Sequence, residues 1–176
     1  TQDVPKYVYD PAKSKKLLAE AGYPNGFSTE IMAYRQREYT EAVMGYLAKV
    51  GIKSSLKYMQ YKALRGIVWD GKAPFHHMTW GSYSMNDVSA ITSHFFKQGR
   101  DDYCVDDEIK GWLETGDSNV DPKVRKDAYK KALSKLSGEL CWLPMFTYAK
   151  YYAFSHDLDF TPTADEIPRF FTAKWK

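Results

Sequence analysis

Residues 9–27 have the sequence YDPAKSKKLLAEAGYPNGF, and this segment decides the expected fold. Asp10 can accept hydrogen bonds from the first free backbone N–H groups of a helix. Pro11 suits the first helical position because that position needs no N–H. Residues 12–21 are mostly good helix formers, and their apolar members fall on one face. The segment therefore predicts a short amphipathic helix that begins at Pro11.

The end of this helix and the start of a strand are marked as well. Gly22 can adopt the left-handed conformation that terminates many helices. Residues 23–26, Tyr-Pro-Asn-Gly, predict a turn. Phe27 then begins a segment of alternating apolar residues. A helix joined to a strand by a tight turn is thus expected near the N-terminus.

Strand and helix patterns continue to alternate after this unit. Strands are predicted at 28–34, 52–58 and 75–80, and helical periodicity separates them. Strands joined by helices run parallel, with right-handed crossovers. The expected fold class is α/β, a mainly parallel twisted sheet with helices on both faces.

The second half of the chain is more helical. Asp87, Asp106 and Asp121 each precede a segment with helical periodicity, where an aspartate can cap the helix. Residues 142–154 are apolar and aromatic, and they predict one or two strands. Residues 156–176 predict an irregular tail.

The composition is that of a soluble globular protein. Among 176 residues, 44% are hydrophobic and 27% are charged. The net charge of +3 is too small to indicate a nucleic-acid partner. No apolar run reaches the length of a membrane span. Aromatic residues make up 16%, which fits a surface that stacks ligands and fits an aromatic core equally well.

Catalytic and metal-binding signatures are absent from the sequence. There is no Gly-x-Ser-x-Gly elbow, P-loop or dinucleotide fingerprint. His76 and His77 are adjacent on a predicted strand and point to opposite faces, so we expect one to be buried and one to be at the surface. Cys104 and Cys141 allow one disulfide, which their spacing neither requires nor excludes. No catalytic residue, metal ligand or cofactor is predicted.

Candidate binding residues follow the three predicted strands. Ligands of open parallel sheets gather at the carboxyl ends of the strands. Arg35 and Arg37 follow the first strand, Tyr61 follows the second, and Trp80 and Asp87 lie at or after the end of the third. An arginine matches a carboxylate, and an aspartate can pair with an ammonium group. These two charges suit the two ends of a zwitterionic peptide.

Structural roles remain open for three of these residues. Arg37 could form a surface salt bridge, and Asp87 could serve only as a helix cap. Trp80 could plug the edge of the sheet. We favour a ligand contact for Trp80 because the last residue of a strand faces the cleft.

The sequence resembles family 5 of the extracytoplasmic solute-binding proteins of ABC importers, which includes dipeptide-, oligopeptide- and nickel-binding proteins. The helix-turn-strand segment 9–27 carries this resemblance most specifically. It continues through Leu47-Ala48-Lys49-Val50-Gly51-Ile52, Trp80–Asp87, Asp121–Tyr129 (with Arg125 and Tyr129), Leu143-Pro144-Met145-Phe146 and Phe171-Thr172-Ala173-Lys174-Trp175.

The resemblance implies that residues 1–176 form a single C-terminal lobe, a fragment of a larger two-lobed protein. Residues 156–176 would then return to the missing lobe. The protein would be a monomer, periplasmic or extracytoplasmic, and associated with the membrane through its transporter. It would capture a small solute, a peptide above all, in an interlobe cleft and deliver it to an ABC permease, with no catalysis.

The resemblance also implies roles for two residues. Arg37 matches the arginine before the family's helix, and Asp87 matches the aspartate of its Asp-Pro motif. The family's dipeptide binders use such a pair to hold the two ends of the peptide. Here Val88 replaces the proline.

Two other functions fit the sequence. One is binding of a metal or metal chelate, as in the nickel-type members of the same family. The other is an α/β enzyme of unrecognised type, which would need an acid–base pair in the cleft.

Overall fold

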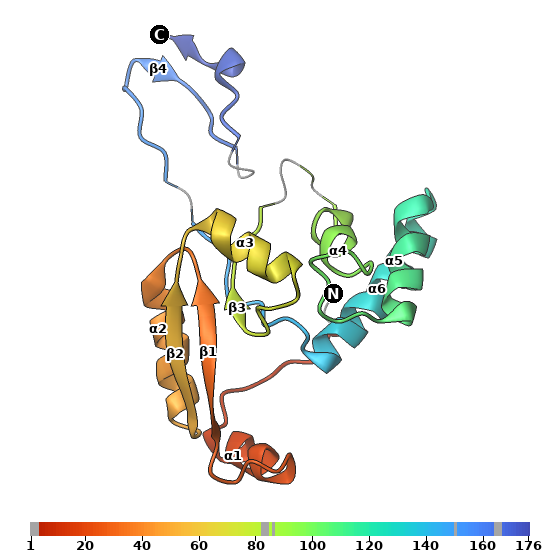
Figure 1. Cartoon of the computed structure of the whole chain (residues 1–176). Coiled ribbons are helices and arrows are strands. Elements are labelled where there is room, and N and C mark those ends of the chain that lie inside the picture. The colour runs from red at the N-terminus through yellow and green to blue at the C-terminus, as the bar shows by residue number, and fades with distance from the viewer. Residues whose placement is uncertain (1–3, 82–84, 86, 150, 164–166) are drawn as a thin grey trace. The chain divides into compact units, whose positions relative to one another are not determined.

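The computed structural model describes residues 4–81, 85, 87–149, 151–163 and 167–176. The chain divides into two compact units, Pro5–Thr79 and Trp80–Lys176, the second of which also takes in Val4. We call them the sheet unit and the helical unit and describe each by itself (Figure 1).

The sheet unit contains a three-stranded sheet and three helices. In chain order its elements are α1 (Pro11–Glu20), β1 (Phe27–Ala33), α2 (Arg37–Ala48), β2 (Ile52–Tyr58), α3 (Tyr61–Trp69) and β3 (His76–His77). The strand order is β2-β1-β3, and β1 is parallel to both of its neighbours. The α/β fold with a parallel sheet and helices is therefore confirmed.

Local chemistry explains where α1 begins and ends. The Asp10 side chain accepts a 2.9 Å hydrogen bond from the backbone N–H of Lys13, and Pro11 occupies the first helical position. After the helix, Gly22 has a φ of 90°, a conformation that glycine adopts without steric cost. The predicted caps of this helix are thus present.

Two glycines bring the starts of β1 and β2 together. Gly26 has a φ of 72° and Gly51 has a φ of 95°. A Cβ atom at Gly26 would overlap the backbone of Gly51. The register that follows pairs Phe27 with Ile52 and ends with Ala33 opposite Tyr58.

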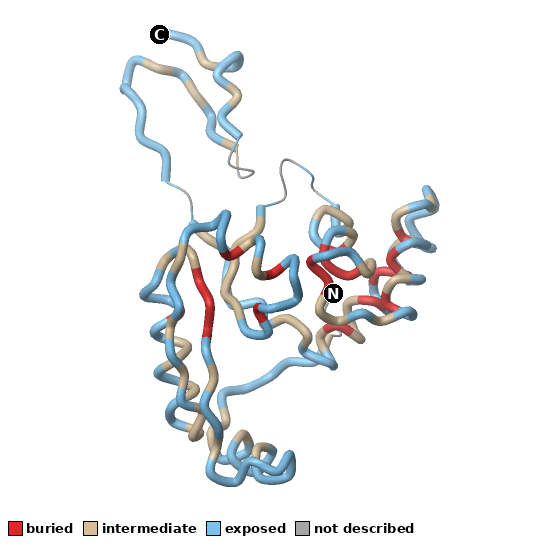
Figure 2. The backbone as a smooth tube through the Cα atoms, in the orientation of Figure 1, coloured by how far each residue is buried: buried red, intermediate tan, exposed pale blue. Residues whose placement is uncertain are grey.

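The core of the sheet unit lies at the carboxyl-terminal half of β1 and under α3. Its buried apolar side chains are Ile31, Met32, Ala33, Leu64, Val68 and Ala73. Figure 2 shows this burial on the upper part of β1, and Figure 1 shows α2 behind the β1–β2 pair. The buried end of the sheet is therefore the end at which Arg35, Arg37 and Tyr61 follow the strands.

In its described residues, the helical unit is built on three α-helices, followed by a short antiparallel strand pair. Its elements are α4 (Ser89–Phe95), α5 (Asp107–Ser118), α6 (Pro122–Glu139), β4 (Leu158–Asp159), η1 (Phe170–Thr172) and β5 (Lys174–Trp175). Its buried core comprises Phe95, Phe96, Ile109, Leu113, Tyr129, Ala132 and Leu136. The predicted caps form, since Asp106 accepts from the Ile109 N–H and Asp121 from the Lys123 N–H, each at 2.8 Å.

A disulfide joins the two ends of the α5–α6 pair. It links Cys104, before α5, to Cys141, after α6, with the Cα atoms 5.5 Å apart. That separation is typical of a disulfide. The bond that the sequence left open is therefore formed.

Three expectations about secondary structure need correction. The strand predicted at 75–80 is wrong in length, because β3 ends at His77. In the register, Ala33 pairs with His77 and β1 ends there, so the residues after His77 lack a ladder partner. No strand forms in the described part of 142–154, where Tyr151 is 93% exposed and no neighbouring strand offers a ladder.

The third correction concerns residues 156–176, which were expected to be irregular. They contain β4, η1 and β5. The N–H of Lys176 donates to the carbonyl of Asp157 at 2.9 Å, which extends the β4–β5 pair. Long-range pairing of short segments has no local sequence period, so the pattern did not predict it.

Candidate functional site

The turn between β1 and α2 has a strained backbone and is flanked by two arginines. Gln36, which lies between Arg35 and Arg37, has a φ of 48°, in the left-handed region that non-glycine residues rarely adopt. It caps α2 without a side-chain hydrogen bond. Its Oε1 atom is buried and accepts no hydrogen bond from the residues that the structure describes. Strain and uncapped N–H groups next to two cations are compatible with an anion site.

Arg37 is the first residue of α2 and remains accessible. Its side chain is 63% exposed, and its Nε donates to Glu41 at 2.7 Å, one helical turn away. Exposed i,i+4 pairs stabilise proteins by only about 0.3–0.5 kcal/mol. The salt-bridge reading of Arg37 is therefore supported, and the pair is weak enough for Arg37 to exchange Glu41 for a carboxylate of higher affinity.

Tyr61 begins α3 beside another tyrosine. Its ring centre lies 5.0 Å from that of Tyr34, which follows β1. The Tyr34 hydroxyl is hydrogen-bonded at 2.6 Å to the Thr79 hydroxyl, after β3. Residues that follow all three strands thus meet at one end of the sheet, and Tyr61 presents a partly exposed aromatic surface there.

The two histidines of β3 have structural partners. Nδ1 of His77 is hydrogen-bonded to the hydroxyl of the buried Thr40 at 2.8 Å, and burial lowers the pKa of His77. Nδ1 of His76 is 2.6 Å from the carbonyl oxygen of Ala73. Both residues are partly buried, so the expected split into one buried and one surface histidine is wrong. The Thr40 hydroxyl therefore holds the ring of His77, and the Ala73 carbonyl holds the ring of His76.

Trp80 belongs to the aromatic edge of the helical core. Its ring stacks on His94 at 4.5 Å and meets Phe95 edge-on at 4.9 Å. Its Nε1 donates to the carbonyl of Ala90 at 3.4 Å. Trp80 is not the last residue of a strand, so the premise of its predicted ligand contact does not hold. A ligand contact for Trp80 remains a prediction.

Asp87 precedes α4 and is held by two donors. Oδ1 accepts from the Ser89 N–H at 3.0 Å, and Oδ2 pairs with Nη2 of Arg125 at 2.5 Å. The contacts with Ser89, and then those with Arg125, hold the pKa of Asp87 below its usual value. The capping reading of Asp87 is supported. Its side chain is also 40% exposed, so it can still meet a solute.

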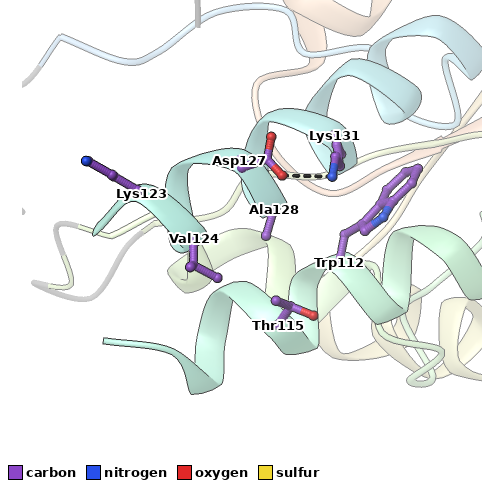
Figure 3. A pocket seen from close by; sticks show the side chains of 7 residues that line it. All are labelled: Trp112, Thr115, Lys123, Val124, Asp127, Ala128 and Lys131. Carbon is purple, nitrogen blue, oxygen red and sulfur yellow. Dashed lines mark ion pairs between the residues drawn. The ribbon is translucent and has the colours of Figure 1, made fainter. Parts of the chain in front are cut away.

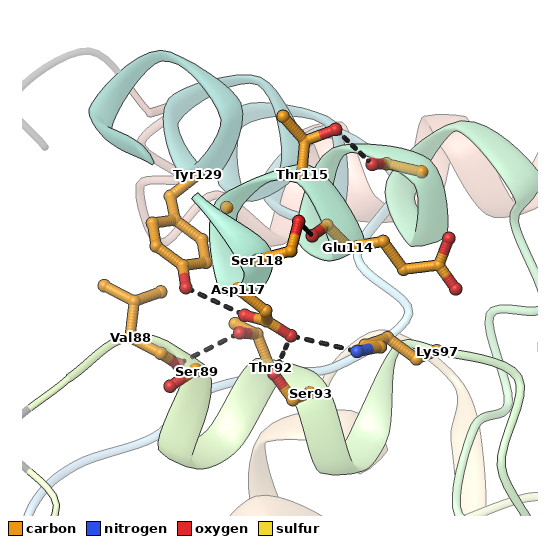
Figure 4. Close-up of polar contacts among 12 residues, drawn as sticks. Val88, Ser89, Thr92, Ser93, Lys97, Glu114, Thr115, Asp117, Ser118 and Tyr129 are labelled. Atoms are coloured by element: carbon orange, nitrogen blue, oxygen red, sulfur yellow. Dashed lines mark hydrogen bonds and ion pairs between the residues drawn. The ribbon is translucent and has the colours of Figure 1, made fainter. Parts of the chain in front are cut away.

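A polar network that the sequence did not predict lies beside this aspartate. Asp117 of α5 accepts hydrogen bonds from Ser93 at 2.5 Å, Lys97 at 3.0 Å and Tyr129 at 2.8 Å (Figure 4). These donors come from α4, the residues after it and α6. Burial raises the pKa of Asp117, but the three hydrogen bonds outweigh burial and lower the pKa overall. The only sequence signal nearby was the match of 121–129 to the family's late helix.

A shallow groove of about 490 Å³ runs along α5 and α6 (Figure 3). It is lined by Trp112, Thr115, Lys123, Val124, Asp127, Ala128 and Lys131. Asp127 and Lys131 pair across one helical turn at 2.8 Å. None of the candidate binding residues lines this groove.

The candidate residues therefore fall into two sets. Arg35, Arg37 and Tyr61 belong to the sheet unit, whereas Trp80 and Asp87 belong to the helical unit. Within the described residues, no group of three or more His, Cys, Asp or Glu side chains could hold a metal ion. No helix of the described part is long and apolar enough to cross a membrane.

Residues 1–102 match the family described as bacterial extracellular solute-binding proteins, family 5 middle. The match covers more than half of the chain. The chain belongs to this family. Family 5 proteins bind solutes and are not enzymes, which confirms the expectation of no catalysis.

Curated family 5 relatives include the glutathione-binding protein GsiB. The protein from Escherichia coli (strain K12) is 25% identical over 173 residues, which cover 89% of this chain and 34% of that protein. The protein from Salmonella typhi is 26% identical over 177 residues, with the same coverage of 89% and 34%. The family 5 chain described here thus spans about a third of the length of these relatives.

Solved structures share the fold. The dipeptide binding protein from Pseudoalteromonas sp. SM9913, in complex with Met-Leu, matches 100% of this chain and 37% of its own, with a TM-score of 0.79 and 21% identity. HbpA2 from Haemophilus parasuis matches 78% of this chain and 29% of its own, with a TM-score of 0.70 and 25% identity. The family 5 chain therefore has the fold of a periplasmic-binding-protein lobe.

Proposed function

We propose that this chain is the C-terminal lobe of the solute-binding component of an ABC importer, and that the solute is a small peptide. The family match over residues 1–102 carries the proposal. The protein acts outside the cytoplasm as a monomer. It captures the solute between two lobes and delivers it to a membrane permease.

Arg37 and Asp87 carry the opposite charges that the two ends of a zwitterionic peptide require. Arg37, with Arg35 beside it, takes the solute carboxylate, because an exposed arginine in a weak pair can change partner at little cost. Asp87 takes the solute ammonium, because its carboxylate is ionised and 40% exposed. Tyr61 and Trp80 offer aromatic surface for the body of the peptide.

Binding in this proposal is coupled to hinge closure. A solute that contacts both lobes shifts the equilibrium toward the closed state by its differential affinity for that state. One lobe offers only part of the contacts. Loss of about 4 kcal/mol of contact energy weakens binding roughly a thousandfold, so the isolated chain binds the solute weakly or not at all.

The C-terminal segment fits a return to the other lobe. Phe170, Phe171 and Trp175 are 68%, 85% and 76% exposed, respectively. Aromatic side chains of this size gain free energy when a partner surface covers them. We assign residues 156–176 to the contact with the remainder of the longer protein.

Calorimetry on the full-length protein tests the proposal. The probes are the dipeptide Met-Leu, its C-terminal amide and its N-acetyl form. Arg37→Ala should weaken binding of Met-Leu about 10-fold or more and leave binding of the amide nearly unchanged, since the amide lacks the carboxylate. Glu41→Gln is the matched control, because it removes the Arg37 partner and leaves Arg37 in place.

Equal losses for Met-Leu and its amide in Arg37→Ala would contradict a carboxylate contact. Native mass spectrometry of gently purified protein provides the second test. A co-purified metal chelate in place of a peptide would contradict the proposed solute class.

A further inference from the structure

The Asp87 carboxylate is oriented before any solute arrives. One oxygen accepts from the Ser89 N–H at 3.0 Å, and the other accepts from Arg125 at 2.5 Å. The Ser89 hydroxyl is a third donor to the carboxylate. An ionised carboxylate has about four lone-pair sites, so this 40% exposed side chain can accept from a further donor. Asp87 is thus an acceptor with a defined direction.

Arg125 is itself held from two further sides. Its Nη1 donates to the carbonyl of Gly116 at 2.6 Å, and its guanidinium carbon lies 5.2 Å from the centre of the Tyr129 ring. Only 25% of its side chain is exposed. A guanidinium fixed in this way loses little additional entropy when it pairs with Asp87. The pair therefore differs from an ordinary mobile surface ion pair.

The anchor of Arg125 extends through the helical unit. The Tyr129 hydroxyl donates to Asp117 at 2.8 Å, and Asp117 also accepts from Ser93 and Lys97 (Figure 4). These contacts connect α6 to α5 and to α4, the helix that follows Asp87. The Asp117 network thus keeps Arg125 in place.

We infer that Arg125 is a positioning residue that aims the Asp87 carboxylate at a primary ammonium group of the solute. The inference rests on the proposed function, because Asp87 must be the residue that meets the solute amine. Arg125 keeps one oxygen in a fixed direction. An ammonium can donate to the remaining lone pairs, whereas an acetylated amine offers no charge. The site then selects solutes with a free primary amine.

The role of Arg125 is tested by measuring how strongly the protein prefers a solute with a free amine over its acetylated form. The full-length protein is titrated with Met-Leu and with N-acetyl-Met-Leu, and in parallel with glutathione and N-acetylglutathione. The readout is the ratio of the two dissociation constants within each pair. A variant that only loosens the fold weakens both members of a pair and leaves the ratio unchanged, so the ratio separates positioning from stability.

The expected ratios differ among the variants. The wild-type protein should favour the free amine about 10-fold or more, because a hydrogen bond to a charged group contributes about 1.5–3 kcal/mol. Asp87→Asn should bring the ratio close to one. Arg125→Gln should reduce it to about threefold or less, and Arg125→Lys should give an intermediate ratio, because lysine keeps the charge without the planar fork.

Lys131→Gln is the matched control on the same helix. Lys131 is a 53% exposed cation that pairs with Asp127 at 2.8 Å, so its replacement should leave the ratio at the wild-type value. Should Arg125→Gln fail to fold, Arg125→Lys decides the matter. A wild-type ratio in Arg125→Lys, together with a lost ratio in Asp87→Asn, would then overturn the inference.

The remaining outcomes separate the inference from the proposed function. An unchanged or increased ratio in Arg125→Gln, with the ratio lost in Asp87→Asn, overturns the role of Arg125 and leaves the proposed function standing. A wild-type ratio of one, or no binding of any of the four probes, overturns the recognition of a solute amine and the inference with it.

Discussion

The hydroxyl of Tyr129 donates a 2.8 Å hydrogen bond to Oδ1 of Asp117, which links α6 to α5 inside the helical unit. Tyr129 is only 6% exposed. Burial, and then the hydrogen bond to Asp117, raise the pKa of Tyr129 to about 12. The same aspartate accepts from Ser93 and Lys97, so one carboxylate gathers three donors.

Replacing this hydroxyl should have a pH-dependent cost. Tyr129→Phe should lower the free energy of unfolding by about 0.5–1.5 kcal/mol at pH 7. The pKa of Tyr129 in the folded state lies above its unfolded value near 10, so the contribution is complete below about pH 10 and is lost as the pH rises through about 12. Urea unfolding of the wild-type protein and of Tyr129→Phe at pH 7, 10 and 11.5 should show that the difference between their free energies of unfolding becomes smaller as the pH rises. A difference that stays constant would contradict the assignment.

Neutralising the acceptor should have the opposite pH dependence. Asp117→Asn should cost about 1.5–3 kcal/mol at pH 7, because several donors lose a charged partner. The pKa of Asp117 is lowered in the folded state. Its contribution is therefore present above its unfolded pKa near 3.9 and is lost as the pH falls through the folded pKa. The measurement is urea unfolding from pH 7 down to pH 3.

Asp127→Asn is the control for this prediction. Its carboxylate is 64% exposed and pairs with Lys131 one turn away. Such pairs contribute about 0.3–0.5 kcal/mol, so the control should change stability little at any pH. Equal losses of unfolding free energy in Asp117→Asn and Asp127→Asn would show that the Asp117 hydrogen bonds stabilise the protein no more than an exposed ion pair does.

Two glycines of α5 should respond in opposite ways to alanine. A Cβ atom at Gly116 would lie 2.9 Å from ring atoms of Tyr129, so Gly116→Ala should destabilise the protein by about 1–3 kcal/mol. At Gly111 nothing lies within 4 Å, so Gly111→Ala should stabilise it by about 0.5–1 kcal/mol through helix propensity. Thermal unfolding distinguishes the two. A stabilising Gly116→Ala would mean that the Tyr129 ring moves freely.

The start of the sheet offers a second matched pair. Gly26 and Gly22 both have positive φ, so alanine is strained at either position. Only at Gly26 would the added Cβ overlap another backbone, that of Gly51. Gly26→Ala should therefore destabilise the protein clearly more than Gly22→Ala, by about 1 kcal/mol or more. Equal unfolding midpoints would contradict the close approach of the two strands.

Removal of the disulfide should weaken the helical unit. Cys104 and Cys141 are 37 residues apart in sequence, and a loop of this length corresponds to about 3–4 kcal/mol in the chain-entropy account. The double variant Cys104→Ala/Cys141→Ala should lose about this much free energy of unfolding. A reductant should lower the unfolding midpoint of the wild-type protein and leave that of the double variant unchanged. Two free thiols in the folded protein, detected by alkylation and mass spectrometry, would contradict the bond.

Local sequence signals were enough to predict the elements that carry their own boundaries. The Asp10-Pro11 start and the Gly22 end define α1, and alternation predicts β1 and β2 to within one residue. These signals work because caps, turns and strand alternation act between residues close in the chain. The sequence also placed Arg37 after β1 and Asp87 before α4. Its motifs indicated the family to which the chain belongs.

Only the tertiary structure decided which distant groups meet. It ended β3 at His77, because β1 ends at Ala33, the partner of His77, and offers no further ladder partner. It also connected Asp87 to Arg125 and Tyr129 to Asp117, across 38 and 12 residues of sequence, respectively. Such contacts depend on how helices pack around a shared core, and packing between elements has no sequence period. The sequence therefore determined the elements and the candidate charges, whereas the packing of α4, α5 and α6 determined how the Asp87 carboxylate is held.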